Sequence, residues 1–245
     1  MSPYILTLTL RQIASQRRTF VMLLFAAVPL LLAVVFRIAA EDGEDPLTFL
    51  GEGMEGVIVA LILPLTALVF GTAALGQELE DGTAVYLLSK PIPRLRIVVE
   101  KAIAAWIATS LVLIVSVVGT GLILLIDDSE FRAIAAFAVA VTLGSLAYTT
   151  LFVCLSIMYN RALIIGLVYV FVWEAIVTNL IDNARYVSVR EFTLGIAESL
   201  ADVPAAVLDA SLGAAASFLL LAAVAAVTTL YASYRLGSFQ VGDQT

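Results

Sequence analysis

Few side chains in this sequence are suited to acid–base, nucleophilic or metal chemistry. Histidine, the commonest general base and metal ligand, is absent from all 245 residues. Asp127 and Asp128 form a carboxylate pair, but they lie in a polar segment where a solvated surface is the expected role. The single cysteine, Cys154, has no partner for an intrachain disulfide and is expected to act as a small apolar filler. We therefore expect neither catalysis nor metal binding.

Motifs that bind nucleotides or zinc are also missing. The sequence has no G-x-x-x-x-G-K-[ST] phosphate loop and no CxxC or HExxH pairing. The net charge of −7 comes mostly from segments expected outside the cell, so it gives no indication of nucleic-acid binding. We therefore expect no cofactor on this chain, and a function that is powered from elsewhere.

Glu174 is an acidic residue inside an otherwise apolar run that follows Arg161. An ionisable group at that depth in a membrane costs at least about 2.5 kcal/mol, so it should face protein or water. Three roles stay open from sequence. Glu174 lines a translocation path, hydrogen-bonds a neighbouring helix in its neutral form, or lies near the outer headgroups.

The elements that must position these residues are long apolar runs. The chain is 62% apolar and 13% charged, with a mean hydropathy of +1.05. About 20 apolar residues in a helix are needed to cross the hydrocarbon layer. The sequence therefore predicts an all-α integral membrane protein, one domain over residues 1–245, with six transmembrane helices. The expected spans are residues 19–37, 56–77, 102–126, 133–158, 162–181 and 210–234.

Three segments between and before these spans have a distinct character. Residues 3–18 are modestly amphipathic, which favours a helix lying in the inner headgroup layer. Residues 78–101 form a long loop of mixed charge. Residues 182–209 place apolar side chains at helical spacing among acidic ones, which favours an amphipathic helix, or a pair, dipping into the outer leaflet. Pro29 and Pro64 allow kinks in the first two spans.

The distribution of Lys and Arg predicts the orientation. If the N-terminus is inside, nine of the 13 Lys and Arg residues fall on the cytoplasmic side and four on the outer side. Positive charge in short loops favours the cytoplasm. Both termini and loop 78–101 are therefore predicted to be cytoplasmic.

Within that loop, the sequence predicts a short helix over residues 83–89. Gly82 separates it from the preceding span, and Pro91 ends it because the residue before a proline disfavours helix. Leu87 and Leu88 are apolar in a segment expected to lie in water. They need a surface to bury them, which indicates a cytoplasmic partner.

The loop also resembles a known signature. The pattern E-x-x-x-G-T-x-x-x-L-L-x-x-P-x-x-R-x-x-x-x-x-x-K is similar to the inner loop of ABC-2 type permeases. The likeness extends over nearly the whole chain: an N-terminal interfacial helix, six spans and an outer hairpin before the last span. The matching residues are Glu78, Gly82, Thr83, Leu87, Leu88, Pro91, Arg94 and Lys101.

The resemblance implies a role for this loop. In the family, the short helix is the coupling helix, which lies in a groove of a separate ATP-binding subunit. Arg161, in the tight turn between the fourth and fifth spans, stands where the family has a second, smaller coupling contact. A charge that only sets the topology is the alternative for Arg161.

The resemblance further implies a permease subunit of an exporter in the inner or plasma membrane of a prokaryotic cell. It would pair with a second permease copy, as a homodimer or heterodimer, and bind two ATP-binding subunits that hold ATP and Mg²⁺. The solute would be a drug, lipid, peptide or ion. Two other functions stay open: a mechanical transmitter acting on an extracytoplasmic partner, and an ion-coupled secondary transporter.

Overall fold

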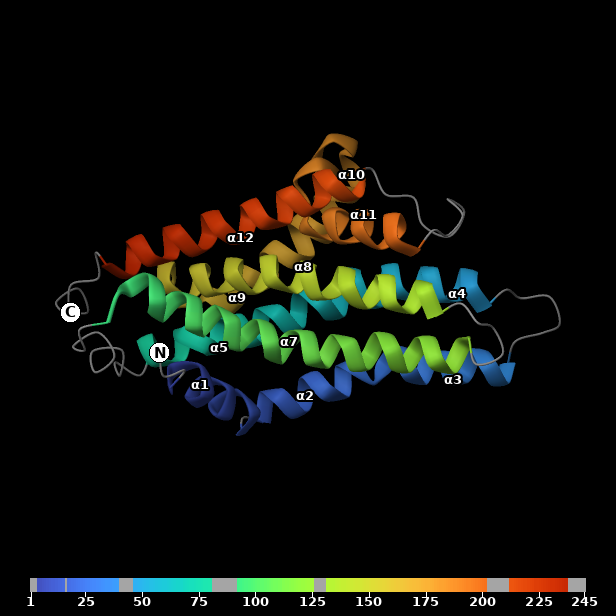
Figure 1. Cartoon of the computed structure of the whole chain (residues 1–245), viewed down its shortest axis with the longest axis horizontal. Coiled ribbons are helices and arrows are strands. Elements are labelled where there is room, and N and C mark those ends of the chain that lie inside the picture. Colours follow the sequence, from blue (N-terminus) through green and yellow to red (C-terminus); the bar gives the residue numbers. More distant parts are fainter. Residues whose placement is uncertain are drawn as a thin grey trace.

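The structure is a computed structural model that describes residues 4–15, 17–39, 46–80, 92–125, 131–201 and 212–237. Every regular element in these ranges is helical. The long helices lie side by side along the longest axis of the molecule (Figure 1). The described part of the chain is thus an all-α bundle.

One helix lies at the centre of the bundle. α8 (Phe131–Met158) packs against α5 (Leu63–Glu80), α7 (Arg94–Leu124), α11 (Val189–Ala201) and α12 (Ala214–Gly237). Most of its residues are buried or half-buried, and its buried side chains include Tyr148, Phe137 and Phe152. In Figure 1 it crosses the middle of the view, with α12 on one side and α7 on the other.

Among the described residues, five helical stretches are long and apolar enough to cross a membrane. They are Thr19–Ala39, Pro46–Gly76, Arg94–Leu124, Phe131–Met158 and Ala214–Gly237. The sixth expected span, residues 162–181, is a shorter apolar helix, Ala162–Val177. It comprises α9 (Ala162–Val168) and the π-helix η2 (Tyr169–Val177), and α10 (Thr178–Leu180) follows.

The first span is interrupted near its proline. α2 (Arg17–Ala26) ends just before Ala27, and α3 (Val28–Ala39) continues from there. Pro29 lacks an N–H and cannot donate to the preceding turn, which weakens the helix at this point. The helix α1 (Tyr4–Ser15) precedes this span and packs mainly against α7.

The helix that contains the second span begins before the expected residue 56. α4 (Pro46–Gly53) leads into the π-helix η1 (Met54–Ile62), which continues as α5. Proline is tolerated in the first turn of a helix, so Pro46 can start one. Glu52 and Glu55 lie inside this continuous helix. The helix is longer than the roughly 20 residues that cross the hydrocarbon layer, so the membrane boundary at residue 56 stays a prediction.

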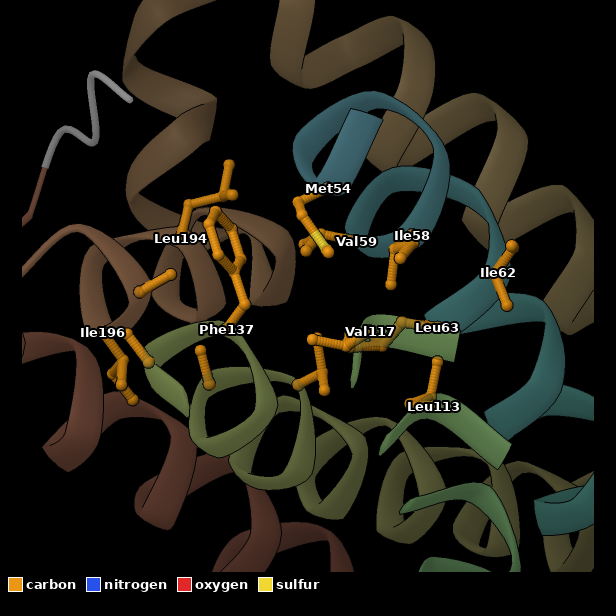
Figure 2. Close-up of a cluster of buried hydrophobic side chains, with 14 of the residues drawn as sticks. Met54, Ile58, Val59, Ile62, Leu63, Leu113, Val117, Phe137, Leu194 and Ile196 are labelled. Atoms are coloured by element: carbon orange, nitrogen blue, oxygen red, sulfur yellow. The ribbon is translucent and has the colours of Figure 1, made fainter. Parts of the chain in front are cut away.

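Two apolar clusters hold the bundle together. The larger joins η1, α7, α8 and α11, and Figure 2 shows Met54 of η1, Phe137 of α8 and Leu194 of α11 within it. The smaller includes Leu75 of α5 and Ile97 of α7. It lies at the end of the bundle where α5 ends at Glu80 and α7 begins at Arg94, called the loop end below. The start of α1 and the last turn of α12 lie at the same end (Figure 1).

The segment after the fifth span contains two helices. A 3₁₀ helix, η3 (Asp182–Val187), leads into α11, and residues 202–211 lie outside the described part of the chain. From Val189 to Ala197 its residues are buried, except the half-buried Arg190. The sequence predicted a helix in this segment, and α11 is one. Its contact with the outer leaflet stays a prediction. Gly144 and Gly195 admit α11 into the bundle, because they let it approach α8 and the start of α12 closely.

Candidate coupling site and a buried carboxylate

Two of the residues expected to couple this chain to an ATPase form an ion pair. Lys101 Nζ of α7 lies 2.5 Å from Glu78 Oε1 of α5. The Lys101 side chain is only 2% exposed and that of Glu78 is 20% exposed. A buried ammonium group needs such a partner, because desolvation penalises an isolated charge. The pair therefore ties together the two helices that flank residues 81–91.

Arg94 lies where the chain returns to helix. Pro93 is extended, with φ −56° and ψ 132°, and its carbonyl accepts hydrogen bonds from the backbone N–H groups of Arg96 and Ile97. Arg94 is half-buried as the first residue of α7. Two residues further along, Arg96 Nε lies 2.6 Å from Glu100 Oε1, a pair within a single helix.

The other predicted coupling residues are placed differently. Arg161 is exposed in the turn after α8. It lies at the loop end, because the neighbouring Met158 packs on the apolar cluster that contains Leu75 and Ile97. The helix predicted over residues 83–89 lies outside the described residues. With it lie Gly82, Thr83, Leu87, Leu88 and Pro91.

Glu174 is 2% exposed and accepts three hydrogen bonds. Oε1 accepts from the Tyr169 hydroxyl at 3.0 Å and from the Val189 backbone N–H at 3.2 Å. Oε2 accepts from the Ser188 hydroxyl at 2.5 Å. Three donors in a buried site offset much of the desolvation penalty of the carboxyl group. Glu174 thus joins the fifth span to the start of α11.

The π-helical geometry of η2 accounts for one of these contacts. Tyr169 and Glu174 are five residues apart. In an α-helix, neighbouring side chains on one face are three or four residues apart. In a π-helix the backbone repeats at i→i+5, which brings residues five apart to the same side. The local widening of the fifth span therefore places the Tyr169 hydroxyl against the carboxylate.

Ser188 begins α11. It is extended, with φ −97° and ψ 127°, and its hydroxyl oxygen accepts a hydrogen bond from the Glu191 backbone N–H at 3.3 Å. This is the geometry of a helix N-cap, and Ser188 with Glu191 matches the capping-box pattern S-x-x-E. The Val189 N–H, another donor left over at a helix start, points at Glu174. Glu174 thus completes the cap from a different span.

A second carboxylate reaches the same turn from the second span. Arg190 Nη2 lies 3.0 Å from Glu55 Oε1 of η1, across 135 residues of sequence. The Arg190 side chain is 15% exposed and that of Glu55 is 38% exposed. Both π-helical segments of the described chain therefore contact the first turn of α11 through a glutamate.

Tyr148 of α8 lies close to this group. It is fully buried, and it lies near enough to Glu174 and Arg190 to interact with their charges. Its hydroxyl nevertheless makes no hydrogen bond of good geometry with any described residue.

Sequence reasoning missed Glu55, Arg190 and Ser188. In the sequence, Glu55 and Arg190 are only charged residues outside the apolar runs, and no local pattern marks them as partners. The S-x-x-E pattern at residues 188–191 is a local signal from which the start of α11 could have been found.

Comparison with known proteins agrees with this architecture. The model of the family described as ABC-2 family transporter protein matches residues 5–235, which is nearly the whole chain. A comparison with curated proteins returns no match. The match covers the α1 helix, the spans and the two helices that flank the loop. The chain therefore belongs to the ABC-2 family of transporter proteins.

Proposed function

We propose that this chain exports a solute across a prokaryotic plasma membrane, as a dimer bound to two ATP-binding subunits. Its family supports this proposal, because a member is the membrane subunit of an ABC transporter and works with an ATP-binding subunit. The loop between α5 and α7 is the proposed coupling site. In this proposal, the ion pair between Glu78 and Lys101 makes the helices of the bundle move when the loop moves.

The observation that carries this proposal is the buried Glu78–Lys101 ion pair. If α5 and α7 were not joined to each other, movement of an attached subunit could displace the loop without moving both helices. A short contact between two largely buried side chains makes the ends of α5 and α7 move together instead. Both helices pack on α8, so movement of the loop end reaches the central helix.

Lys101→Met tests this coupling role. We expect the purified complex to retain its ATP-binding subunits, because the docking residues are unchanged, but to hydrolyse ATP about fivefold or more slowly in liposomes. That factor is the lower end of ordinary coupling free energies. Glu100→Gln is the matched control, since Glu100 pairs with Arg96 of the same helix, α7, and its loss should leave the rate unchanged.

The double variant Glu78→Lys/Lys101→Glu separates coupling from folding, because it restores an ion pair with reversed charges. Recovery of ATP hydrolysis supports the proposal. Wild-type hydrolysis in Lys101→Met would contradict the role of the pair.

Export and mechanical transmission differ in whether a solute moves. Inverted vesicles that contain the complex should accumulate a compound from a cell metabolite extract when ATP is present, as measured by mass spectrometry. ATP hydrolysis with no accumulated compound would favour the mechanical transmitter. Failure of the chain to co-purify with an ATP-binding subunit would favour a secondary transporter.

A further inference from the structure

We propose that a groove between α7 and α8 binds one acyl chain of a membrane phospholipid. The groove has a volume of about 380 Å³ and is lined by six residues of α7, between Trp106 and Val115, and by Thr142 of α8. Ligand pockets commonly measure about 300–1,000 Å³, so this groove is large enough to hold part of an amphiphile. The inference is independent of the proposed function, because the ligand is a component of the membrane and not the solute.

The first observation is the chemistry of the lining. Only apolar surface faces the groove, because the polar groups of the lining residues are bonded within the bundle. Trp106 Nε1 donates to the Thr142 carbonyl at 2.8 Å, and Thr142 Oγ1 donates to the Ala138 carbonyl at 2.7 Å. The hydroxyls of Ser110 and Ser145 share a hydrogen bond of 3.0 Å. A polar ligand would give up hydrogen bonds on entering and gain none from this lining, so the groove favours a hydrocarbon chain.

The second observation is that the groove is preformed. Trp106 and Ser110 are one turn apart in α7, and each is hydrogen-bonded to α8. Ser110 is 7% exposed and forms the floor, whereas Leu111 and Val115 on the rim are 61% and 55% exposed. A small side chain between larger ones therefore leaves a depression that the described part of the chain does not fill.

The third observation is the depth of the groove. Residues 106 and 115 are nine residues apart, which is about 14 Å along a helix. One leaflet contributes half of the roughly 30 Å hydrocarbon core, or about 15 Å. The lining residues of α7 lie mainly in the half of the expected span 102–126 that is nearer the loop end. The groove thus matches the length of an acyl chain in the leaflet at the loop end.

The polar end of the same face lies at the loop end. Glu100, Ile107 and Ile114 are spaced seven residues apart, about two turns, so they lie on one face of α7. Glu100 pairs with Arg96, whose side chain is 36% exposed. The groove begins about two turns deeper than this ion pair. A phospholipid in the leaflet at the loop end has the same order, with a polar headgroup followed by its chains.

Packing favours a lipid chain over a second copy of the protein in this groove. Within a bilayer, apolar groups are already surrounded by hydrocarbon, so close packing decides which contacts form. Helices approach one another best through small residues, but Ile107, Leu111 and Ile114 on the rim hold a second helix away from the floor. A flexible chain can lie on the floor and restore the dispersion contacts that an unfilled groove would lack.

Photolabelling tests the site. The full chain is purified in a steroid-based detergent, which has no alkyl chain to compete for the groove. The probe is a phosphatidylglycerol with a diazirine in the middle of one acyl chain, added in increasing amounts, and the labelled residues are identified by mass spectrometry. We expect labelling of residues 106–115 to reach a plateau at one probe per chain. An excess of ordinary phosphatidylglycerol should displace it.

Val115→Phe fills the groove from its rim without removing any of the hydrogen bonds beneath it. We expect labelling of residues 106–115 to fall about tenfold, which corresponds to about 1.4 kcal/mol. Val35→Phe is the matched control, because Val35 of α3 is 60% exposed and does not line the groove, so labelling should stay at the wild-type level. If Val115→Phe lowers the Tm of the chain, Leu111→Phe on the same rim replaces it.

Three results would overturn the site. The first is labelling of residues 106–115 that rises in proportion to the probe, or a plateau that persists in both rim variants. The second is a Val115→Phe chain that changes from dimer to monomer with unchanged labelling, which would show that the groove contacts a second copy. The third is loss of the label from the complete complex during ATP hydrolysis, which would show that the ligand is a transported amphiphile and not a resident lipid.

Discussion

At the scale of single residues, two buried charged side chains of the described chain, Lys101 and Glu174, have partners in other elements. Lys101 is held by Glu78, and Glu174 is held by the start of α11. Each arrangement offsets the penalty of placing an ionisable group in an apolar bundle. Each also joins two helices whose movements then depend on one another.

Glu174→Ala should destabilise the protein. The substitution leaves the Tyr169 and Ser188 hydroxyls and the Val189 N–H without their acceptor, and each unsatisfied buried donor costs about 1–3 kcal/mol. We expect the Tm of the detergent-solubilised protein to fall, with a smaller fall for Glu174→Gln, which keeps one acceptor oxygen. Glu52→Ala, at an exposed position of α4, is the control and should leave the Tm unchanged.

An unchanged Tm in Glu174→Ala, together with lost transport, would show that Glu174 serves the translocation path instead. Normal Tm and normal transport in the same variant would leave it as a charge near the outer headgroups. The three roles open from sequence are therefore separated by two measurements on one variant.

The depth of Glu174 could be predicted from sequence, but its partners could not. A run of apolar residues on both sides showed that the carboxylate lies inside a span. Which donors surround it depends on the π-helical turn and on the chain reversal through η3, and neither changes the hydropathy. The pairing of Glu55 with Arg190 could not be predicted either, because 135 residues separate them in the sequence.

At the scale of elements, long helices with uniform apolar runs were predicted closely. α8 spans Phe131–Met158, so it begins two residues before the expected span of 133–158 and ends at the same residue. The helix of the second span extends beyond the expected range, to Pro46, because Glu52 and Glu55 lower the hydropathy of its first turns although Glu55 is paired in the fold. A helix was expected within residues 182–209, and α11 is one. Its burial could not be predicted, because it depends on glycines on both sides that let it pack closely.

Leu88→Asp tests the predicted coupling helix at residues 83–89. Burying a leucine at an interface is worth roughly 1.5–3 kcal/mol, and a charge there adds a desolvation penalty. We therefore expect binding of the ATP-binding subunit to weaken about tenfold or more, since about 1.4 kcal/mol corresponds to a factor of ten. Binding is measured by titrating the purified subunits.

Ser89→Ala is the mild control for this experiment and should bind normally. The Leu88→Asp chain should still be folded, because the residue lies in the segment between two intact spans. Normal binding together with normal ATP hydrolysis by Leu88→Asp would contradict the assignment of residues 83–89 as the coupling helix.

At the scale of the whole molecule, the first and last spans lie at the periphery. Thr19–Ala39 and Ala214–Gly237 have most of their side-chain surface exposed, whereas Pro46–Gly76 and Phe131–Met158 are largely buried. Their exposed residues are mostly apolar, which suits contact with lipid or with a second copy of the chain.

The orientation of the bundle is a prediction from the nine-to-four distribution of Lys and Arg. Single cysteines at Ser89 and Ser129, in a Cys154→Ser background, should react with a membrane-impermeant thiol reagent from opposite sides. Position 89 should react from the cytoplasmic side only and position 129 from the outside only. Reaction of both from outside would overturn the topology, and with it the cytoplasmic location of the coupling loop.

The two contacts of α11 also differ in when they become available during synthesis. Glu174 precedes Ser188 by 14 residues, so that contact forms almost as soon as the fifth span is made. Glu55 precedes Arg190 by 135 residues, and ribosomes add about 5–20 residues per second, so its partner emerges about 7–27 s later. The nascent second span must carry an uncompensated carboxyl group through this interval. We therefore expect the half of the bundle opposite the loop end to assemble late in biogenesis, after translation of the distant segment that carries Arg190.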